Sequence, residues 1–414
     1  MYHSVLSVNL KVFLWLYEKK DVPLQAVKRI VQLFFMLVFA VTSRGGQDSV
    51  VNVTNFDSVE VSLLTCAPHE EVYSLYGHTA LRWRDLRTGE DLSFNWGVFN
   101  FQKPHFVLRF IFGLTDYELG VSDYQPFADY YKHWGSMVTE QVLNLTAEEK
   151  LKLNQLLYNN YLPENRIYRY NYFYDNCSTR PRDIIEACIN GTVEYEQRED
   201  FCPSFRQMIR QKTANHDWAT EGNDFLLGVR ADMKTTREEQ EFLPENLLYD
   251  FDHARIHASD GSWRQLVSNR RVAVAPGVQV VKSDFFLTPV EVGIILLVVS
   301  LCLFVVEWRR RHTFKYWDVA LMTITGLAGC MLFVMLFSQH PATSTNLQLL
   351  LINPIHLYFI PSVLKRRKTV YWNMLLVMVL LLFAGGIFQH YATLTPFLAL
   401  CLLLRYWIHQ RREK

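Results

Sequence analysis

Long apolar runs dominate the last quarter of the chain, whereas the residues before them mix apolar and polar positions as globular sequences do. Basic residues crowd the connecting segments "EWRRRHTFK" and "KRRK" and the tail "HQRREK", while "SQHPATSTN" and "QHYAT" contain no Lys or Arg. Basic loops stay in the cytoplasm, so we expect the part before residue 286 to lie outside and the C-terminus inside. Each apolar run is close to the ~20 residues that cross a bilayer as a helix. We predict five spans, at about residues 286–306, 317–337, 347–363, 371–389 and 394–408.

An earlier apolar run has the pattern of a secretory signal. Lys28 and Arg29 precede it, and the small residues Ala40, Thr42 and Ser43 follow. This order of charge, apolar run and small residues is typical of a signal peptide. We therefore predict a signal peptide or an uncleaved signal anchor over residues 1–43, with a buried core helix as the other interpretation.

The segment between the signal and the spans mixes strand and helix patterns, and we divide it at residues 44–191 and 192–285. "SVEVSLLTCAP" predicts a strand, and "GHTALRWRD", "RTGED" and "LSFNWGVF" predict a β-hairpin. "LTAEEKLKLNQLLYNNYLPEN" predicts an amphipathic helix that Thr146 and Glu149 cap. The later part predicts a helix in "TTREEQEFLPENLLYDFDHARI" and a strand in "RRVAVAPGVQVV". The whole predicts an α+β external domain, followed by a transmembrane domain over residues 286–414.

The stretch "RYNYFYDNCSTRPRD" places a cysteine where a helix begins. Pro181 is tolerated only in the first turn of a helix, where its missing N–H is not needed. Cys177 therefore lies at or just before the helix N-terminus. The helix dipole and the free N–H groups there favour an anion, which predicts a depressed thiol pKa. Arg180 and Arg182 act in the same direction, and together these features make Cys177 a candidate nucleophile.

A cysteine nucleophile needs a base, and His78 at the start of a predicted strand is the best candidate. The structural alternative, a buried small cysteine and an ordinary histidine, stays open. The histidines at positions 69, 105 and 133 are rivals. Asn95, on the next predicted strand, is the right type to orient His78. However, a two-residue turn at Thr88–Gly89 would pair Asn95 with Arg82, about 13 Å from His78 at ~3.3 Å per residue, so a longer loop or a bulge would be needed.

Composition limits the remaining possibilities. The formal net charge is +1, which gives no reason to expect a nucleic-acid partner. No CxxC pair occurs, so a structural zinc site is not expected, and we expect no cofactor. A Cys188–Cys202 disulfide could form in an oxidising compartment. Arg82 shares the face of His78 and could meet a phosphate, although a solvated arginine is the alternative.

Three segments, "YGHTALRWRD", "FNWGVFNF" and "YRYNYFYDNCSTRPRDII", resemble the signature of the Lnb-type periplasmic domain. The "HPATSTNLQLLLINP" stretch also resembles that family. The resemblance implies a circularly permuted papain-like fold, with the histidine strand before the cysteine helix, as in lecithin:retinol acyltransferase. It also implies a lipoprotein N-acyltransferase of the inner membrane, with Cys177 as nucleophile and His78 as base. The donor would be a membrane phospholipid and the acceptor the α-amino group of a diacylated lipoprotein.

Several expectations concern the membrane surface. His340, Asn346 and Asn353 lie at the outer ends of the second and third predicted spans and could hold a lipid head group, or serve as loop and cap residues. The segment "FNFQKPHFVLRFIFGLTDYELG" could line an acyl groove, enter the interface, or be ordinary core. Two other functions stay open. One is a membrane-anchored cysteine peptidase or amidase that acts on cell-wall peptide, and the other is a non-catalytic receptor or scaffold.

Overall fold

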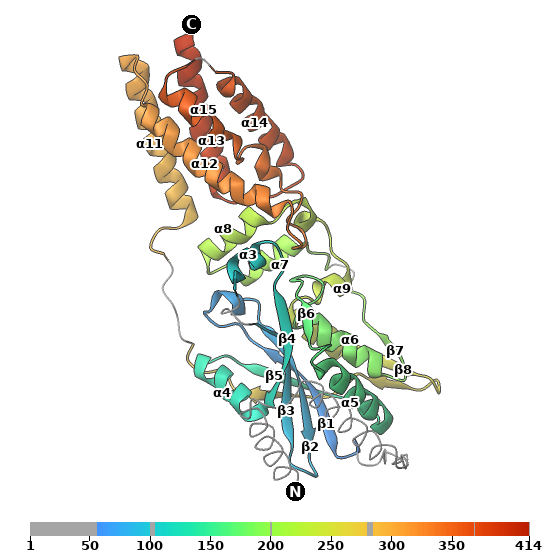
Figure 1. Cartoon of the computed structure of the whole chain (residues 1–414). Helices are drawn as coiled ribbons and strands as arrows, with labels where there is room; N and C mark the ends of the chain where they lie inside the picture. The colour runs from blue at the N-terminus through green and yellow to red at the C-terminus, as the bar shows by residue number, and fades with distance from the viewer. Residues whose placement is uncertain (1–55, 100–103, 199–200, 280–284, 368, 414) are drawn as a thin grey trace, which may run out of the picture. The chain divides into compact units, whose positions relative to one another are not determined.

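The computed structural model describes residues 56–99, 104–198, 201–279, 285–367 and 369–413. Residues 1–43, the predicted signal or anchor, lie outside the described residues. All described residues belong to one compact unit, Val53–Lys414. Within it, strands and helices precede a set of apolar helices (Figure 1), which confirms the predicted α+β class with a C-terminal helical part.

The strands in the described part of the chain form two sheets, one large and one small. The large sheet has seven strands in the order β10-β5-β1-β2-β3-β4-β6, and the small one has the order β7-β8-β9. All neighbouring strands in both sheets are antiparallel. The strands are β1 (Val59–Cys66), β2 (His78–Asp85), β3 (Asp91–Val98), β4 (Asp116–Asp123), β5 (Val138–Leu143), β6 (Ile167–Arg169), β7 (Gly191–Glu194), β8 (Arg255–Ala258), β9 (Trp263–Gln265) and β10 (Val267–Val274).

Helices cover the sheet and then form the C-terminal part. The α-helices of the first part are α3 (Phe106–Ile111), α4 (Tyr124–Trp134), α5 (Ala147–Tyr161), α6 (Thr179–Cys188), α7 (Phe205–Lys212), α8 (Asp217–Leu226), α9 (Arg237–Gln240) and α10 (Pro244–His253). The later ones are α11 (Pro289–Arg310), α12 (Lys315–Met335), α13 (Ile355–Leu364), α14 (Tyr371–Gly385) and α15 (Leu394–Glu413). Among the described residues, the 3-10 helices are η2 (Val72–Ser74), η3 (Val229–Asp232) and η4 (Leu347–Leu350).

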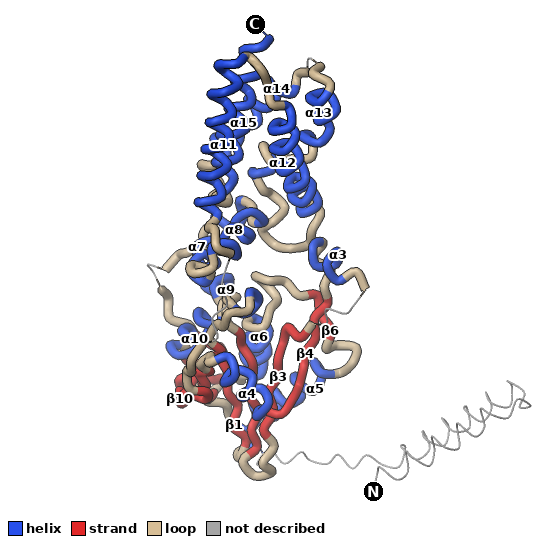
Figure 2. Tube along the Cα trace, turned by 90° about the vertical axis from the view of Figure 1, so that its left-hand side faces the viewer, coloured by secondary structure: helices blue, strands red, loops and turns tan. Residues whose placement is uncertain are grey.

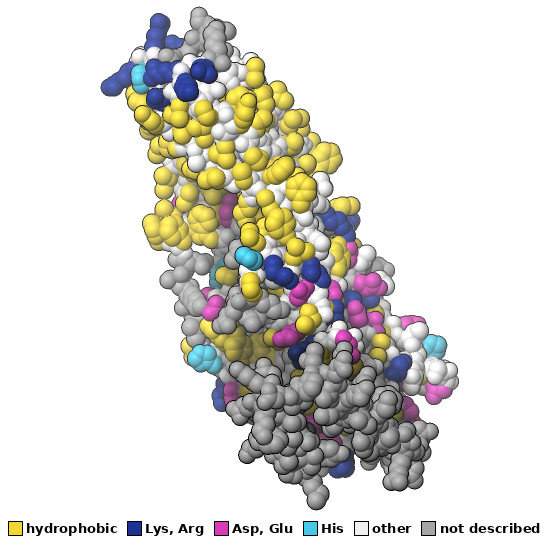
Figure 3. Space-filling view, viewed as in Figure 1, with side chains coloured by type: hydrophobic (Ala, Val, Ile, Leu, Met, Phe, Trp, Pro, Cys, Tyr) yellow, Lys and Arg dark blue, Asp and Glu magenta, His cyan; other side chains and the backbone are white. Residues whose placement is uncertain are grey.

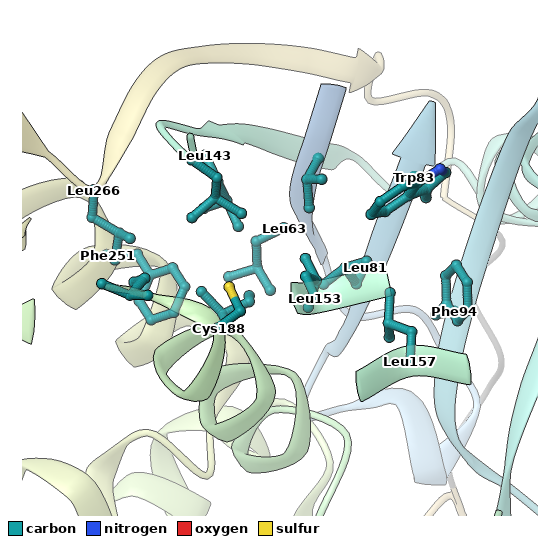
Figure 4. Packing of buried hydrophobic residues seen from close by; sticks show 14 of the residues in the cluster. Leu63, Leu81, Trp83, Phe94, Leu143, Leu153, Leu157, Cys188, Phe251 and Leu266 are labelled. Carbon is teal, nitrogen blue, oxygen red and sulfur yellow. The ribbon is translucent and has the colours of Figure 1, made fainter. Parts of the chain in front are cut away.

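Alternation along the strands gives the large sheet two apolar faces, because successive side chains point to opposite sides. Leu63 belongs to the main core with residues of α5, α6 and α10, whereas its neighbour Leu64 packs with α4 on the other face. Accordingly, α4 lies on one side of the sheet and α5 and α6 on the other (Figure 2). Figure 4 shows the main core, where Leu153 and Leu157 of α5 lie beside strand residues.

Most local predictions from the sequence are confirmed. Thr146 accepts a hydrogen bond from the Glu149 N–H at 3.2 Å, and Glu149 Oε2 accepts one from the Thr146 N–H at 2.8 Å, so α5 begins with the expected capping box. Pro181 lies in the first turn of α6. The hairpin of β2 and β3 is also present, but its register differs from the prediction. A connection at residues 86–90 replaces the two-residue turn, and Arg82 pairs with Ser93 instead of Asn95.

The C-terminal helices follow the predicted apolar runs. Three described segments are long and apolar enough to cross a membrane, namely α11, α12 and Leu347–Leu364, which comprises η4 and α13. The helix α14 is shorter, with 15 residues, and α15 has 20 residues. Hydrophobic side chains cover the visible face of these helices, and Lys and Arg gather at the end that carries the C-terminus (Figure 3).

Close packing and one buried ion-pair cluster hold these helices together. A side chain at Gly329 of α12 would lie 2.2 Å from the Asn353 Cα, so only glycine allows this approach. Near the C-terminal end, the buried Arg405 of α15 donates to Asp318 of α12 at 2.6 Å and to Glu307 of α11 at 2.8 Å. Because a charged group inside a membrane protein needs a partner, this cluster fixes three helices to one another.

Candidate active site

The turn that leads into α6 is built around Asn176, which is buried. Its Oδ1 accepts hydrogen bonds from the N–H groups of Ser178 and Thr179 at 2.8 and 3.0 Å. Its Nδ2 donates to the carbonyl oxygens of Tyr172 and Phe242 at 3.0 and 2.8 Å. Asn176 thus caps the turn that precedes the helix. Cys177 lies in this turn, two residues before α6 begins at Thr179, which agrees with the prediction that it lies at or just before the helix N-terminus.

The strand β2 brings His78 to Cys177. Thr79, the next residue, ties the strand to the helix because its Oγ1 lies 2.9 Å from Ser178 Oγ. Its backbone N–H also donates to the Cys177 sulfur. The His78 side chain is hydrogen-bonded to Cys177, and both residues are half-buried. The two residues that the sequence predicts as a pair are therefore in contact.

Asn95 lies on the other side of the His78 ring. The observed register pairs Arg82 with Ser93, so Asn95 lies two residues nearer to His78 than the predicted register would place it, and its amide comes within reach. The distance from His78 Nε2 to Asn95 Oδ1 is 3.3 Å. Since a carbonyl oxygen only accepts, Nε2 carries the proton and Nδ1 is left for the thiol. The sequence predicts that Asn95 reaches His78 only if the loop between the two strands is longer than two residues. The loop at residues 86–90 is longer, and Asn95 does reach His78.

Electrostatics favour a charged pair. Burial disfavours the thiolate, but the charge and hydrogen bond of His78, the Thr79 N–H and the Ser178 hydroxyl outweigh it and lower the pKa of Cys177. Burial likewise disfavours the imidazolium, but Cys177 and then Asn95 outweigh it and raise the pKa of His78. Each residue thus stabilises the charged form of the other, the direction that is typical of cysteine nucleophiles activated by histidine.

A glycine and a tyrosine border the thiol. Gly97 has φ +98° and lies at a bulge of β3, between Trp96 and Val98. A Cβ atom at Gly97 would lie 3.9 Å from the Cys177 Cβ and 3.8 Å from Cε2 of Tyr170. Burial, and then the proximity of Cys177, raise the pKa of Tyr170, so its hydroxyl stays protonated. The absence of a side chain at Gly97 leaves space directly beside the candidate nucleophile.

The nearby arginines do not have the role that the sequence suggests. Arg180 donates to both oxygens of Asp175, at 2.5 and 2.8 Å, and Arg182 donates to Glu241 at 2.9 Å. Their charges are therefore balanced by carboxylates. The lowered pKa of Cys177 has His78, the Thr79 N–H and the Ser178 hydroxyl as its causes instead.

Arg82 is buried among protein carboxylates, an arrangement that does not favour the expected contact with a phosphate. It donates to both oxygens of Asp91, at 2.8 and 2.6 Å, and to both oxygens of Glu140, at 3.2 Å. Its guanidinium also lies 3.5 Å from the centre of the Tyr124 ring. This arginine joins the sheet to α4, and its Nε, Nη1 and Nη2 all donate to protein carboxylates.

The three polar residues near the outer ends of the spans also have structural partners. His340 Nε2 donates to the Phe110 carbonyl oxygen at 2.5 Å. Asn346 Nδ2 donates to the Phe225 carbonyl oxygen at 2.7 Å, while its Oδ1 accepts from Gln389 Nε2 at 3.0 Å. Asn353 Oδ1 accepts from the Ile355 N–H at 3.0 Å, as a local cap. None of the three lies with Cys177 and His78, and the loop and cap roles that the sequence left open fit these contacts.

The Asn346 contact is part of a junction between α8 and the apolar helices. Gln348 Nε2 donates to the carbonyl oxygens of Asp224 and Phe225, both at 3.0 Å, and Gln389 Nε2 donates to that of Leu227 at 3.0 Å. The carboxylate of Glu221 accepts from the N–H groups of residues 393 and 394, at 2.7 and 3.0 Å, and so caps α15. Side chains of the apolar helical part thus donate hydrogen bonds to backbone carbonyls at the end of α8, and a side chain of α8 accepts hydrogen bonds from backbone N–H groups at the start of α15.

Cys188 is a buried thiol in the main core and forms no disulfide with Cys202. Within the ranges that the structure describes, no group of three or more His, Cys, Asp or Glu residues could hold a metal ion.

Sequence reasoning missed Asn176, Thr79 and Gly97. Asn176 had a usable signal, because asparagine directly before a predicted helix is a preferred N-cap. The contact of Thr79 with Ser178 joins segments 99 residues apart, and no local pattern reports it. The proximity of Gly97 to Cys177 depends on a bulge that only the strand pairing reveals.

Comparison with known proteins agrees with the division into a sheet domain and a helical C-terminal part. The family model described as Lnb N-terminal periplasmic domain matches residues 47–211, and the one described as Lnb transmembrane domain matches residues 281–414. Together they cover most of the chain. Searches of curated proteins and of solved structures gave no match.

Proposed function

This chain belongs to the Lnb family and is a membrane protein with a periplasmic domain, and from that premise we propose that it is a lipoprotein N-acyltransferase. It would move an acyl chain from a membrane phospholipid to the α-amino group of the lipidated N-terminal cysteine of a diacylated lipoprotein. The observation that carries the proposal is the contact of Cys177 with His78, and of His78 with Asn95, in a chain with membrane-spanning helices. The order of the histidine strand and the cysteine helix supports a permuted papain-like fold.

In the first half-reaction, the Cys177 thiolate attacks the carbonyl carbon of a phospholipid ester. A C–S bond forms, the ester C–O bond breaks, and His78 gives its proton to the departing lysophospholipid oxygen. Because the pKa of Cys177 is lowered, its thiolate forms more readily. Because the pKa of His78 is raised, its ring more readily holds the proton that it gives to the leaving group. The product is a thioester on Cys177.

In the second half-reaction, the α-amino group of the lipoprotein attacks the thioester carbonyl. His78 accepts a proton from the amine, the C–S bond breaks, and the thiolate is restored with an amide as product. Asn95 would hold the His78 ring in one orientation through both steps. The backbone N–H of Cys177, at the start of a capped turn, is a candidate donor to the oxyanion of each tetrahedral intermediate.

Charge along the membrane part supports an inner-membrane location with a cytoplasmic C-terminus. The basic stretches between α11 and α12, between α13 and α14, and at the C-terminal end of α15 would all face the cytoplasm. The sheet domain would then lie in the periplasm, where the lipid ester and the lipoprotein acceptor meet at the membrane surface.

The test is the intact mass of the purified full chain after incubation with phospholipid alone, quenched in acid. We expect an added fatty-acyl mass that is absent in Cys177→Ala. Addition of a synthetic diacylated lipopeptide should then remove the adduct and yield the N-acyl product. No adduct, together with cleavage of a cell-wall peptide, would replace the proposal with the peptidase or amidase. Neither adduct nor cleavage, with lipopeptide also present, would favour a receptor or scaffold.

A further inference from the structure

The short helix α3 exposes apolar side chains. It lies in the connection between β3 and β4, and its Leu108 is 56% exposed. Phe110 packs against the His340 ring, with centroids 5.3 Å apart, and is still 47% exposed. Large apolar side chains that are grouped on a surface mark an interaction site. The residues around α3 indicate which kind of surface this site binds.

That neighbourhood is the end of a membrane span. Carbonyl oxygens of residues 110–112 accept hydrogen bonds from three consecutive residues after α12. The donors are Ser338 Oγ at 2.7 Å, the Gln339 N–H at 2.9 Å and His340 Nε2 at 2.5 Å. The fit is tight, since a side chain at Gly113 would lie 2.8 Å from the His340 nitrogen. The helix is therefore fixed at the level where α12 ends.

Exposed apolar surface continues from the span to α3. Phe333 of α12 and Phe337 just after it are 47% and 67% exposed. Phe337 immediately precedes Ser338, whose hydroxyl is bonded to the Ile111 carbonyl. The lipid-facing surface of the span and the exposed face of α3 thus meet at this contact.

Basic side chains accompany the apolar ones. Arg109 of α3 and Arg169 of β6 both donate to Asp116, at 2.7 and 2.9 Å, and both remain partly exposed. Two guanidinium groups share one carboxylate, which leaves one net positive charge beside α3. Apolar groups with an adjacent cationic site match the order of acyl chains and phosphate groups at a bilayer interface.

We propose that α3 inserts Leu108 and Phe110 into the periplasm-facing leaflet, among phospholipid acyl chains, with Arg109 and Arg169 at the head-group level. The catalytic domain then rests on the bilayer through its own sheet connection, in addition to its covalent link to α11. The inference depends on the membrane spans and not on the proposed chemistry, so it can stand if the acyltransferase proposal fails.

The experiment is photo-crosslinking of the full chain in nanodiscs of phosphatidylglycerol and phosphatidylethanolamine. Benzoylphenylalanine is placed singly at positions 108, 110, 333 and 158, in a Cys177→Ala background so that no thioester contributes mass. Position 333 is the lipid-facing control, and Tyr158 of α5, 67% exposed, is the matched control on the sheet domain.

After irradiation, intact mass should show phospholipid adducts at positions 108 and 110, as at 333, and none at 158. The proposal is overturned if 333 gives a lipid adduct while 108 and 110 give none. It is also overturned if 108 and 110 yield a doubled chain mass, because a second copy would then cover α3.

Discussion

Replacing His78 with Ala removes the cation and the hydrogen bond that oppose burial at Cys177. Burial by itself raises the pKa of a thiol. Cys66, which pairs with His78 across β1 and β2, illustrates this, because burial prevails there and its pKa is raised. At Cys177 the charge of His78 is the largest influence against burial, and its hydrogen bond is the next. In His78→Ala the thiol should therefore titrate at higher pH than in the native chain.

The magnitude follows from the thiolate fraction. A thiol at the reference pKa of about 8.5 is about 3% thiolate at pH 7, and each further unit lowers that fraction about tenfold. Native Cys177 has a lowered pKa, so its thiolate is lost only as pH falls through that value. We expect the alkylation rate of Cys177 at pH 7 to fall at least about tenfold in His78→Ala, with its pH profile displaced upwards.

The assay measures iodoacetamide alkylation of the full chain by intact mass, between pH 5 and 10 in steps of about one unit. Cys177→Ala gives the background from the other cysteines, such as the exposed Cys202. His133→Ala is the matched control, since His133 is exposed on α4. A His78→Ala profile that coincides with that of His133→Ala would refute the reasoning, because Cys177 would then be activated without its histidine.

Three further changes test other parts of the site and the fold. Asn95→Ala removes the hydrogen bond to His78, worth about 0.5–1.5 kcal/mol, and should slow acyl transfer about 2–10-fold in single-turnover assays. An unchanged rate would mean that Asn95 does not orient His78. Gly97→Val fills the space beside the thiol and should abolish the acyl adduct. Gly89 has a similar positive φ but no atom nearby, so the control Gly89→Val should keep the adduct. Equal loss of the adduct in both variants would mean that backbone strain, and not the filled space, is the cause. Glu221→Gln weakens the cap of α15 by about 0.5–2 kcal/mol and should lower the melting midpoint in detergent by a few degrees. The control is Glu194→Gln, at an exposed position. Equal midpoints in the two variants would mean that the cap does not stabilise the fold.

The start of α6 was predictable because its signals are local. Pro181 is tolerated only in a first turn, so the proline fixes the helix start and with it the position of Cys177. The capping box of Thr146 and Glu149 is likewise a pattern within four residues. These features depend on backbone geometry that neighbouring residues determine.

Other parts depend on contacts between distant segments. The loop at residues 86–90 sets the β2–β3 register, and a two-residue error in that loop alone moves Asn95 away from His78. Arg82 looked available because its partner Glu140 lies 58 residues later in the chain. Asn346 looked like a lipid ligand because its acceptor, the Phe225 carbonyl, belongs to a helix in another part of the chain.

The junction at α8 bears on how the protein is made. Carbonyl groups of Asp224, Phe225 and Leu227 find their donors on Gln348, Asn346 and Gln389, residues that are synthesised more than a hundred positions later. Until those loops are in place, the end of α8 lacks these partners, and α15 lacks its carboxylate cap. The exported domain and the last membrane helices must therefore complete one another after translocation. A chain that is cut before α11 would retain the thiol and its histidine but not a finished α8.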